Sequence, residues 1–244
     1  DSYQAKQAIE FAYLSGFSNI NLDLMHGLPN QTVKDSLFDL ETALQFEPKH
    51  LSWYQLMIEP GTLFAKKTPV LPNEEELYEI EKTGHKLLSQ HHYEYYETSV
   101  YCIKNFECQH NLNYWRFGDY FGIGAGAHAK LTHMDPENNF IVVRLQKTNN
   151  PIQYLKGSYI EGSNIISKKD LPLEFMMNAL RLINGVPVEL FEQRTGLALN
   201  SIMPQLEKAY KEGFIEDFSK RIQPTPFGQK FLNECLNIFV TDRN

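Results

Sequence analysis

The stretch NINLDLMHGLP, residues 19–29, predicts a β-strand that ends in a tight turn. Apolar side chains alternate with the polar side chains of Asn21 and Asp23, and a period of two residues is that of a strand. The Gly-Leu-Pro sequence at residues 27–29 then breaks the strand. One face of this strand is therefore apolar and the other carries an amide and a carboxylate.

Helical and strand patterns alternate around this stretch. Thr32 and Asp35 have the spacing of a helix capping box, and the helix they open stops before Pro48. The other expected elements are helices at 1–16 and 73–91 and strands at HLSWYQLMIEP (50–60) and YEYYETSVY (93–101). This order predicts parallel strands joined by right-handed crossovers, as in an α/β barrel or a doubly wound sheet. It covers about half of such a barrel.

The pattern changes to helices from about residue 166. Helical spacing predicts several helices and one hairpin, with helices at 168–185, 187–196, 200–213 and 227–239 and the hairpin at 213–228. This series resembles a winged-helix module. The sequence thus predicts two domains, a barrel portion with the following glycine-rich segment at 1–165 and a winged-helix-like domain at 166–244.

Composition excludes several classes of protein. A net charge of -7 and a pI near 5.6 argue against general affinity for nucleic acid or anionic membrane. In the C-terminal module Lys208 and Lys211 are offset by Glu207 and Glu212, so a packing or lid role is favoured over DNA binding. No apolar run is long enough to span a bilayer, and a cytoplasmic location is expected. Three cysteines without a CxxC predict reduced thiols.

Polar side chains inside a barrel suggest a ligand site. Asn21 and Asp23 are expected to face the barrel interior, where Asp23 either hydrogen-bonds a ligand hydroxyl or amine or joins a structural network. Trp53 and Met57 alternate with polar residues on the next strand, which fits a ligand cavity and an ordinary core equally well.

The stretch QHNLNYWRFGDYFGIGAGAH, residues 109–128, is unusually rich in rings and glycine. Its glycines at every second position remove the side chains from one face, so that a flat or bulky group could approach the backbone. His110, Tyr114 and Trp115 supply an imidazole and two large rings, the chemistry that surrounds a haem. The alternative is that His110 and His128 are ordinary core or loop histidines and the glycines serve tight packing.

Four motifs together resemble a known family. DLMHGLP, HLSWYQLMIEP, YETSVY and above all QHNLNYWRFGDYFGIGAGAH are similar to the oxygen-independent coproporphyrinogen III oxidase-like branch of the radical SAM proteins, most closely to the HemW-type haem chaperones. The resemblance implies the C-terminal part of a radical SAM partial (β/α) barrel, followed by a mainly helical domain. It also implies S-adenosyl-L-methionine and a 4Fe-4S cluster held by CxxxCxxC. That motif is absent, and Cys102 and Cys108 have the wrong spacing, so the cluster ligands are expected upstream of Asp1.

The resemblance also assigns individual residues. Asp23 matches an aspartate that contacts S-adenosyl-L-methionine, while Met57 and His128 match positions whose backbone touches it. The sequence from His110 to Trp115 matches the HNxxYW signature of the haem chaperones. It implies that His110 coordinates haem iron and that Tyr114 and Trp115 pack against the macrocycle.

Three functions stay open at this point. In the first, the intact protein binds haem and passes it to an acceptor protein. In the second, it is an enzyme that uses a deoxyadenosyl radical to decarboxylate propionate side chains of coproporphyrinogen III to vinyl groups. The HNxxYW match favours the first. In the third, this chain folds only partly and has neither function, and it self-associates through an exposed sheet edge or through the surface that would contact the missing part of the barrel.

Overall fold

The computed structural model describes residues 1–137 and 139–240. The chain forms two compact units, Asp1–Cys108 and Gln109–Asn244. This division groups residues 109–165 with the C-terminal helices, whereas the sequence groups them with the barrel strands. The domain boundary at residue 165 stays a prediction.

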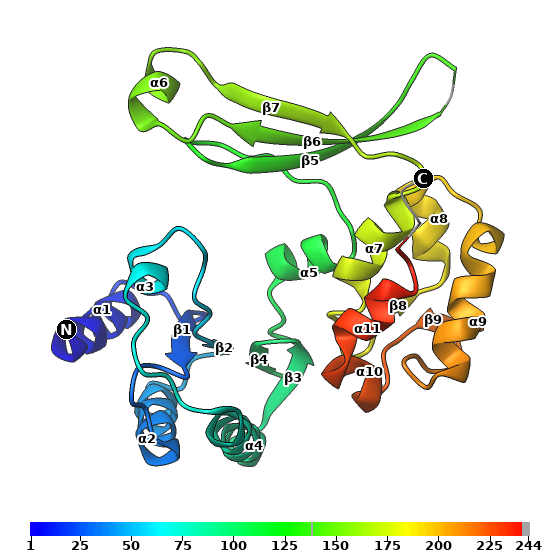
Figure 1. The fold of residues 1–244 in the computed structure, drawn as a ribbon. Helices are drawn as coiled ribbons and strands as arrows, with labels where there is room; N and C mark the ends of the chain where they lie inside the picture. The colour runs from blue at the N-terminus through cyan, green and yellow to red at the C-terminus, as the bar shows by residue number, and fades with distance from the viewer. Residues whose placement is uncertain (138, 241–244) are drawn as a thin grey trace. The chain divides into compact units, whose positions relative to one another are not determined.

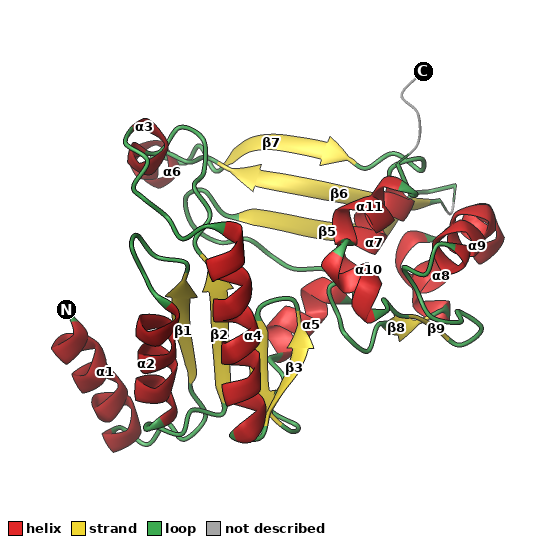
Figure 2. Ribbon diagram, turned by 60° about the horizontal axis from the view of Figure 1, so that its bottom comes forward, coloured by secondary structure: helices red, strands yellow, loops and turns green. Residues whose placement is uncertain are grey.

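The first unit is a four-stranded sheet with helices on one side (Figures 1 and 2). The strand order is β1-β2-β4-β3, with β1 parallel to β2 and β4 antiparallel to both of its neighbours. The elements are α1 (Ser2–Leu14), β1 (Asn21–His26), α2 (Val33–Leu44), β2 (His50–Gln55), α3 (Leu63–Lys66), α4 (Glu74–Gln90), β3 (Tyr93–Glu97) and β4 (Val100–Ile103).

The predicted third parallel strand is instead a hairpin. Residues 93–101 fold back at Thr98 and Ser99, and β4 inserts antiparallel between β2 and β3. The Ser99 carbonyl accepts from the Trp53 amide at 2.9 Å, which joins the turn to β2. The expectation of an all-parallel sheet was therefore wrong for this strand, although β3 still runs in the direction of β2.

The core of the first unit lies between the sheet and helices α2 and α4. Trp53 of β2 is buried there with Leu40, Leu51 and Ile80. The indole lies directly against Gly84 of α4, because a β-carbon at that position would come 2.0 Å from a Trp53 ring carbon. The absence of a side chain at residue 84 thus lets the helix approach the sheet.

We expect Gly84→Ala to lower the free energy of unfolding of the first unit by about 1–3 kcal/mol, because the added methyl overpacks the Trp53 site. Urea unfolding followed by tryptophan fluorescence measures this change. Gly162→Ala is the control, since a β-carbon there meets nothing within 4 Å and leaves the unfolding midpoint unchanged. Equal stability of the two variants would contradict the packing argument.

A second consequence of this core is a dependence of stability on pH. His26 is buried against Trp53, with ring centroids 4.3 Å apart, and its Nδ1 has no hydrogen-bond partner in the described residues. Burial, with a smaller contribution from His85, lowers the pKa of His26 from 6.5 to about 4. The unfolded chain therefore binds a proton below pH 6.5 that the folded chain does not bind until about pH 4.

We expect the free energy of unfolding to fall as the pH drops from 6.5 to 4, by up to about 3 kcal/mol from His26 alone. Denaturant titrations at several pH values measure the slope. His26→Phe should flatten it, whereas His133→Gln, at an exposed histidine, should not. A slope that survives His26→Phe unchanged would show that other groups carry the effect.

The second unit combines an antiparallel sheet with a helical module. The sheet has the order β5-β6-β7 and was not predicted from the sequence. The elements are α5 (Gln109–Trp115), β5 (His128–Met134), β6 (Phe140–Lys147), α6 (Pro151–Leu155), β7 (Ile160–Ile165), α7 (Leu171–Ala179), β8 (Val186–Pro187), α8 (Glu189–Thr195), the 3-10 helix η1 (Leu199–Ile202), α9 (Met203–Lys211), β9 (Arg221–Ile222), α10 (Pro226–Lys230) and α11 (Leu232–Asn237).

The C-terminal module differs from its prediction in two places. The expected hairpin at 213–228 is reduced to one bridge between Ile215 and Pro224, and β9 pairs with β8 instead. Pro224 and Pro226 donate no backbone N–H, which limits the ladder. The expected last helix is broken at Phe231 (φ -115°, ψ 44°) into α10 and α11. No helix in the described part of the chain is long and apolar enough to cross a membrane.

Candidate functional site

The first candidate site is the sheet face that points away from α2 and α4. Asn21 and Asp23 of β1 are exposed, whereas Leu22 and Leu24 pack against the buried core. The predicted division of this strand into a polar and an apolar face is thus confirmed. The parallel register places Asn21 beside His50 and Asp23 beside Ser52.

A series of hydrogen bonds on this face runs from the interior of the unit to Asp23. The Asn21 amide donates to Asp23 Oδ1 at 2.7 Å, and Asn21 Oδ1 lies 2.6 Å from His50 Nδ1. Ser52 also donates to Asn21 Oδ1, at 3.2 Å. His50 Nε2 lies 2.8 Å from the Tyr96 hydroxyl. Burial lowers the pKa of His50, against a smaller opposing effect of Asp23.

His50 and Tyr96 are members of this site that sequence reasoning missed. Both are buried, on β2 and β3 respectively. A signal for His50 was present, because a polar residue opens the strand at the position that pairs with Asn21 in a parallel register. No pattern pointed to Tyr96, since its position depends on the irregular register between β3 and β4.

Met57 is not on the strand to which it was assigned. Strand β2 ends at Gln55, and Met57 is 73% exposed in the following loop. Trp53 belongs to the core on the helix side, as the interpretation of this strand as an ordinary core strand expected for it. Met57 remains a candidate only for a backbone contact.

The second candidate site is helix α5 in the second unit. His110 is exposed, and its ring meets Tyr114 edge-on, with centroids 4.8 Å apart at 80°. Tyr114 in turn packs on Tyr120 at 4.3 Å. Trp115 has a different partner, because the Arg181 guanidinium lies 4.3 Å from the centre of its ring. The structure therefore brings His110 and Tyr114 together and directs Trp115 toward Arg181.

The glycines in the glycine-rich segment allow close backbone contact and backbone angles that other residues rarely adopt. A β-carbon on Gly122 would come 2.1 Å from the carbonyl oxygen of His128, so this glycine allows two backbone segments to meet. Gly124 and Gly126 have positive φ angles of 105° and 74°. The tight-packing interpretation of the glycines is thus correct for Gly122. His128 itself is exposed at the start of β5.

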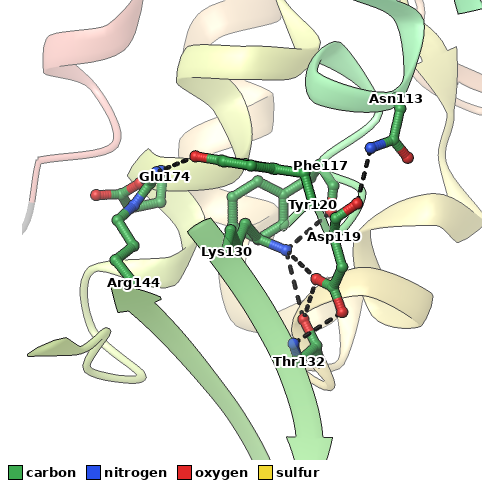
Figure 3. Close-up of polar contacts among 8 residues, drawn as sticks. All are labelled: Asn113, Phe117, Asp119, Tyr120, Lys130, Thr132, Arg144 and Glu174. Carbon is green, nitrogen blue, oxygen red and sulfur yellow. Dashed lines mark hydrogen bonds and ion pairs between the residues drawn. The ribbon is translucent and has the colours of Figure 1, made fainter. Parts of the chain in front are cut away.

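An ion pair between the buried Lys130 and the exposed Asp119 fixes the segment after α5 to the sheet (Figure 3). Lys130 is 2% exposed, and its Nζ donates to Asp119 Oδ1 at 2.9 Å and to the Phe117 carbonyl at 3.0 Å. Asp119 also accepts from the amide and hydroxyl of Thr132, both at 2.8 Å. Asn113 of α5 donates to the Asp119 carbonyl at 2.9 Å. Burial lowers the pKa of Lys130 although Asp119 opposes this effect.

We expect Asp119→Ala to cost about 3–5 kcal/mol of unfolding free energy, because it leaves the Lys130 ammonium buried without its counter-charge. Lys130→Met should cost less, since the carboxylate that remains reaches solvent. Denaturant unfolding of both variants gives the comparison. Glu79→Ala is the control, because its pair with Lys82 is exposed and should contribute less than about 1 kcal/mol. The reverse order of costs would contradict this account.

The described residues do not fit an iron-sulfur cluster. Cys102 and Cys235 are buried, and burial raises the pKa of each thiol to about 12. Among the residues that the structure describes, no group of three or more His, Cys, Asp and Glu side chains could hold a metal ion. An exposed carboxylate at Asp23 fits a hydroxyl or amine ligand, and an exposed imidazole at His110 fits a porphyrin iron.

Comparison with known proteins identifies relatives. Residues 166–231 match the HemN C-terminal domain. Heme chaperone HemW of Haemophilus influenzae is 46% identical over 239 residues, which are 98% of this chain and 61% of that protein. Heme chaperone HemW of Escherichia coli K12 is 44% identical, with 98% and 62% covered. The chain thus spans about three fifths of the length of these curated relatives.

A solved structure supports the fold. Coproporphyrinogen III oxidase (HemN) of Escherichia coli, described as a radical SAM enzyme, matches with a TM-score of 0.73 and 18% identity, over 99% of this chain and 59% of that one. The predicted mixed α/β fold with a HemN-type C-terminal domain is confirmed. The chain is thus similar to the HemW heme chaperones over 98% of its length, and its residues 166–231 match the HemN C-terminal domain.

Proposed function

We propose that the protein is a haem chaperone, which binds haem and transfers it to an acceptor protein. The observation that carries this proposal is the 46% identity to a heme chaperone over 98% of the chain. The alternative, oxidation of coproporphyrinogen III, is supported by a relative that is only 18% identical, and a likeness at that level concerns the fold.

His110 is the proposed haem ligand in this chain. Its imidazole is exposed on α5, and Tyr114 offers a ring surface one helical turn away. A neutral imidazole is a common axial ligand of haem iron, and an adjacent aromatic ring suits the apolar macrocycle. Trp115 as a second haem contact stays a prediction, and its packing on Arg181 supports a role in holding α5.

Asp23 is the proposed contact to S-adenosyl-L-methionine. The carboxylate is exposed and has one oxygen bonded to Asn21, so it can accept from a hydroxyl or amine. Backbone contacts from Met57 and His128 complete the proposal. A 4Fe-4S cluster supplies an electron to S-adenosyl-L-methionine in radical SAM chemistry, and the cysteines described here do not fit as its ligands.

The remaining proposals concern location and association. Three free thiols favour the cytoplasm, where thiols stay reduced. Strand β1 lies at the edge of its sheet, which supports self-association through that edge. The net charge of -7 supports the absence of a nucleic-acid partner.

We expect haem titration of the purified protein to give a saturable Soret shift at one haem per chain. His110→Ala should lose the shift or weaken binding at least about tenfold, because the iron loses its proposed axial ligand. His133→Ala, at an exposed histidine of β5, should bind as the unaltered chain does.

Two outcomes would contradict the proposal in different ways. Full binding by His110→Ala would exclude His110 as the ligand while leaving the chaperone function in place. Failure of the unaltered protein to bind haem, together with oxidation of coproporphyrinogen III, would favour the enzyme instead.

A further inference from the structure

We propose that His50 and Tyr96 are positioning residues for Asp23, acting through Asn21. Together the four residues form a hydrogen-bonded chain that starts inside the first unit and ends at an exposed carboxylate. The proposal rests on the proposed function, since it assigns Asp23 a ligand to hold. Its structural part concerns this chain alone and can be tested without that ligand.

The carboxylate fixes the direction of every hydrogen bond in the chain. An ionised Asp23 can only accept, so Asn21 must turn its NH₂ group toward Asp23 Oδ1, 2.7 Å away. The amide oxygen of Asn21 then faces His50 Nδ1 at 2.6 Å, which requires a proton on that nitrogen. His50 Nε2 is left without a proton in the neutral ring, and the Tyr96 hydroxyl donates to it at 2.8 Å.

The ends of the chain are closed by further contacts. Tyr96 accepts from the Cys108 amide at 3.3 Å, which orients its own hydroxyl. Ser52 donates to Asn21 Oδ1 at 3.2 Å, so both lone pairs of that oxygen are used. Asn21 is thus held from two sides, and only one of the two orientations of its amide group makes all of these hydrogen bonds.

The two positioning residues are buried, whereas the residue that would contact the ligand is exposed. His50 is 5% exposed and Tyr96 is 7% exposed, whereas Asn21 and Asp23 are exposed. A rotamer fixed by buried partners loses less freedom when a ligand binds, which is how outer residues support a binding carboxylate. Asn21 donates to Asp23 Oδ1, so Asp23 Oδ2 is the oxygen left for the ligand.

The opposite face of the same sheet offers a matched comparison. There His85 Nδ1 lies 3.0 Å from the hydroxyl of Tyr101, which is as buried as Tyr96. That pair packs against Tyr95 and Trp53 on the helix side of the sheet, which is the face opposite Asp23. Loss of the Tyr101 hydroxyl therefore removes a buried hydrogen bond without reaching Asp23.

The first test is the tautomer of His50, read from imidazole ¹⁵N chemical shifts of the labelled protein. A free neutral imidazole prefers the proton on Nε2, so a proton on Nδ1 of His50 is a specific expectation. In Asp23→Ala the amide of Asn21 is free to flip, and the Nδ1-protonated fraction should fall. The tautomer of His85 should not respond to this substitution. A proton on Nε2 of His50, or no response to Asp23→Ala, would overturn the chain of bonds.

The second test is binding of S-adenosyl-L-methionine, measured by equilibrium dialysis. Tyr96→Phe should weaken binding about threefold to tenfold, the effect of one lost hydrogen bond. Tyr101→Phe should bind within about twofold of the unaltered protein, because its hydroxyl lies on the other face. Equal losses in the two variants would show that burial alone matters and would overturn the positioning role.

The two tests separate failure of this proposal from failure of the proposed function. If Asp23→Ala binds S-adenosyl-L-methionine with unchanged affinity, Asp23 does not contact that ligand, and the positioning role of His50 and Tyr96 is excluded as well. The tautomer would in that case still report whether the chain of bonds exists. If Asp23→Ala loses binding and Tyr96→Phe does not, Asp23 is the contact but is not positioned through His50.

Discussion

The parallel register of β1 and β2 decides which side chains the first unit buries and which it presents. Asn21 pairs with His50 and Leu24 pairs with Trp53, so polar residues meet on one face and apolar residues on the other. A shift by one residue would turn every side chain of β1 to the opposite face. The approach of α4 at Gly84 and the chain of bonds to Asp23 both depend on this register.

Local sequence predicted the first unit well where alternation and capping act within a few residues. The capping box of Thr32 and Asp35 is present as expected, with the Asp35 amide donating to Thr32 Oγ1 at 3.2 Å. The two faces of β1 follow from its alternation. The turn at Thr98 and Ser99 was missed because tyrosines and valine favour a strand on both sides of it, and no glycine or proline interrupts them.

Long-range contacts account for the rest of what the sequence did not predict. The sheet β5-β6-β7 carries charged and polar residues among its apolar ones, so alternation did not reveal its strands, although β5 and β6 form a hairpin in which Met134 pairs with Phe140. A lysine is expected to be exposed, yet Lys130 is buried, because it forms an ion pair with Asp119, eleven residues earlier. The types of the residues in α5 did not show which rings meet: His110 and Tyr114 meet edge-on, whereas the Trp115 ring lies against the Arg181 guanidinium.

The bonds around Asp119 have a thermodynamic consequence for whatever binds at α5. Asn113, Phe117 and Lys130 tie the end of that helix to β5 before any ligand arrives (Figure 3). A segment that is already ordered loses little conformational entropy on binding, so more of the contact energy remains as affinity. The same rigidity lets a bound ligand leave without the helix having to unfold.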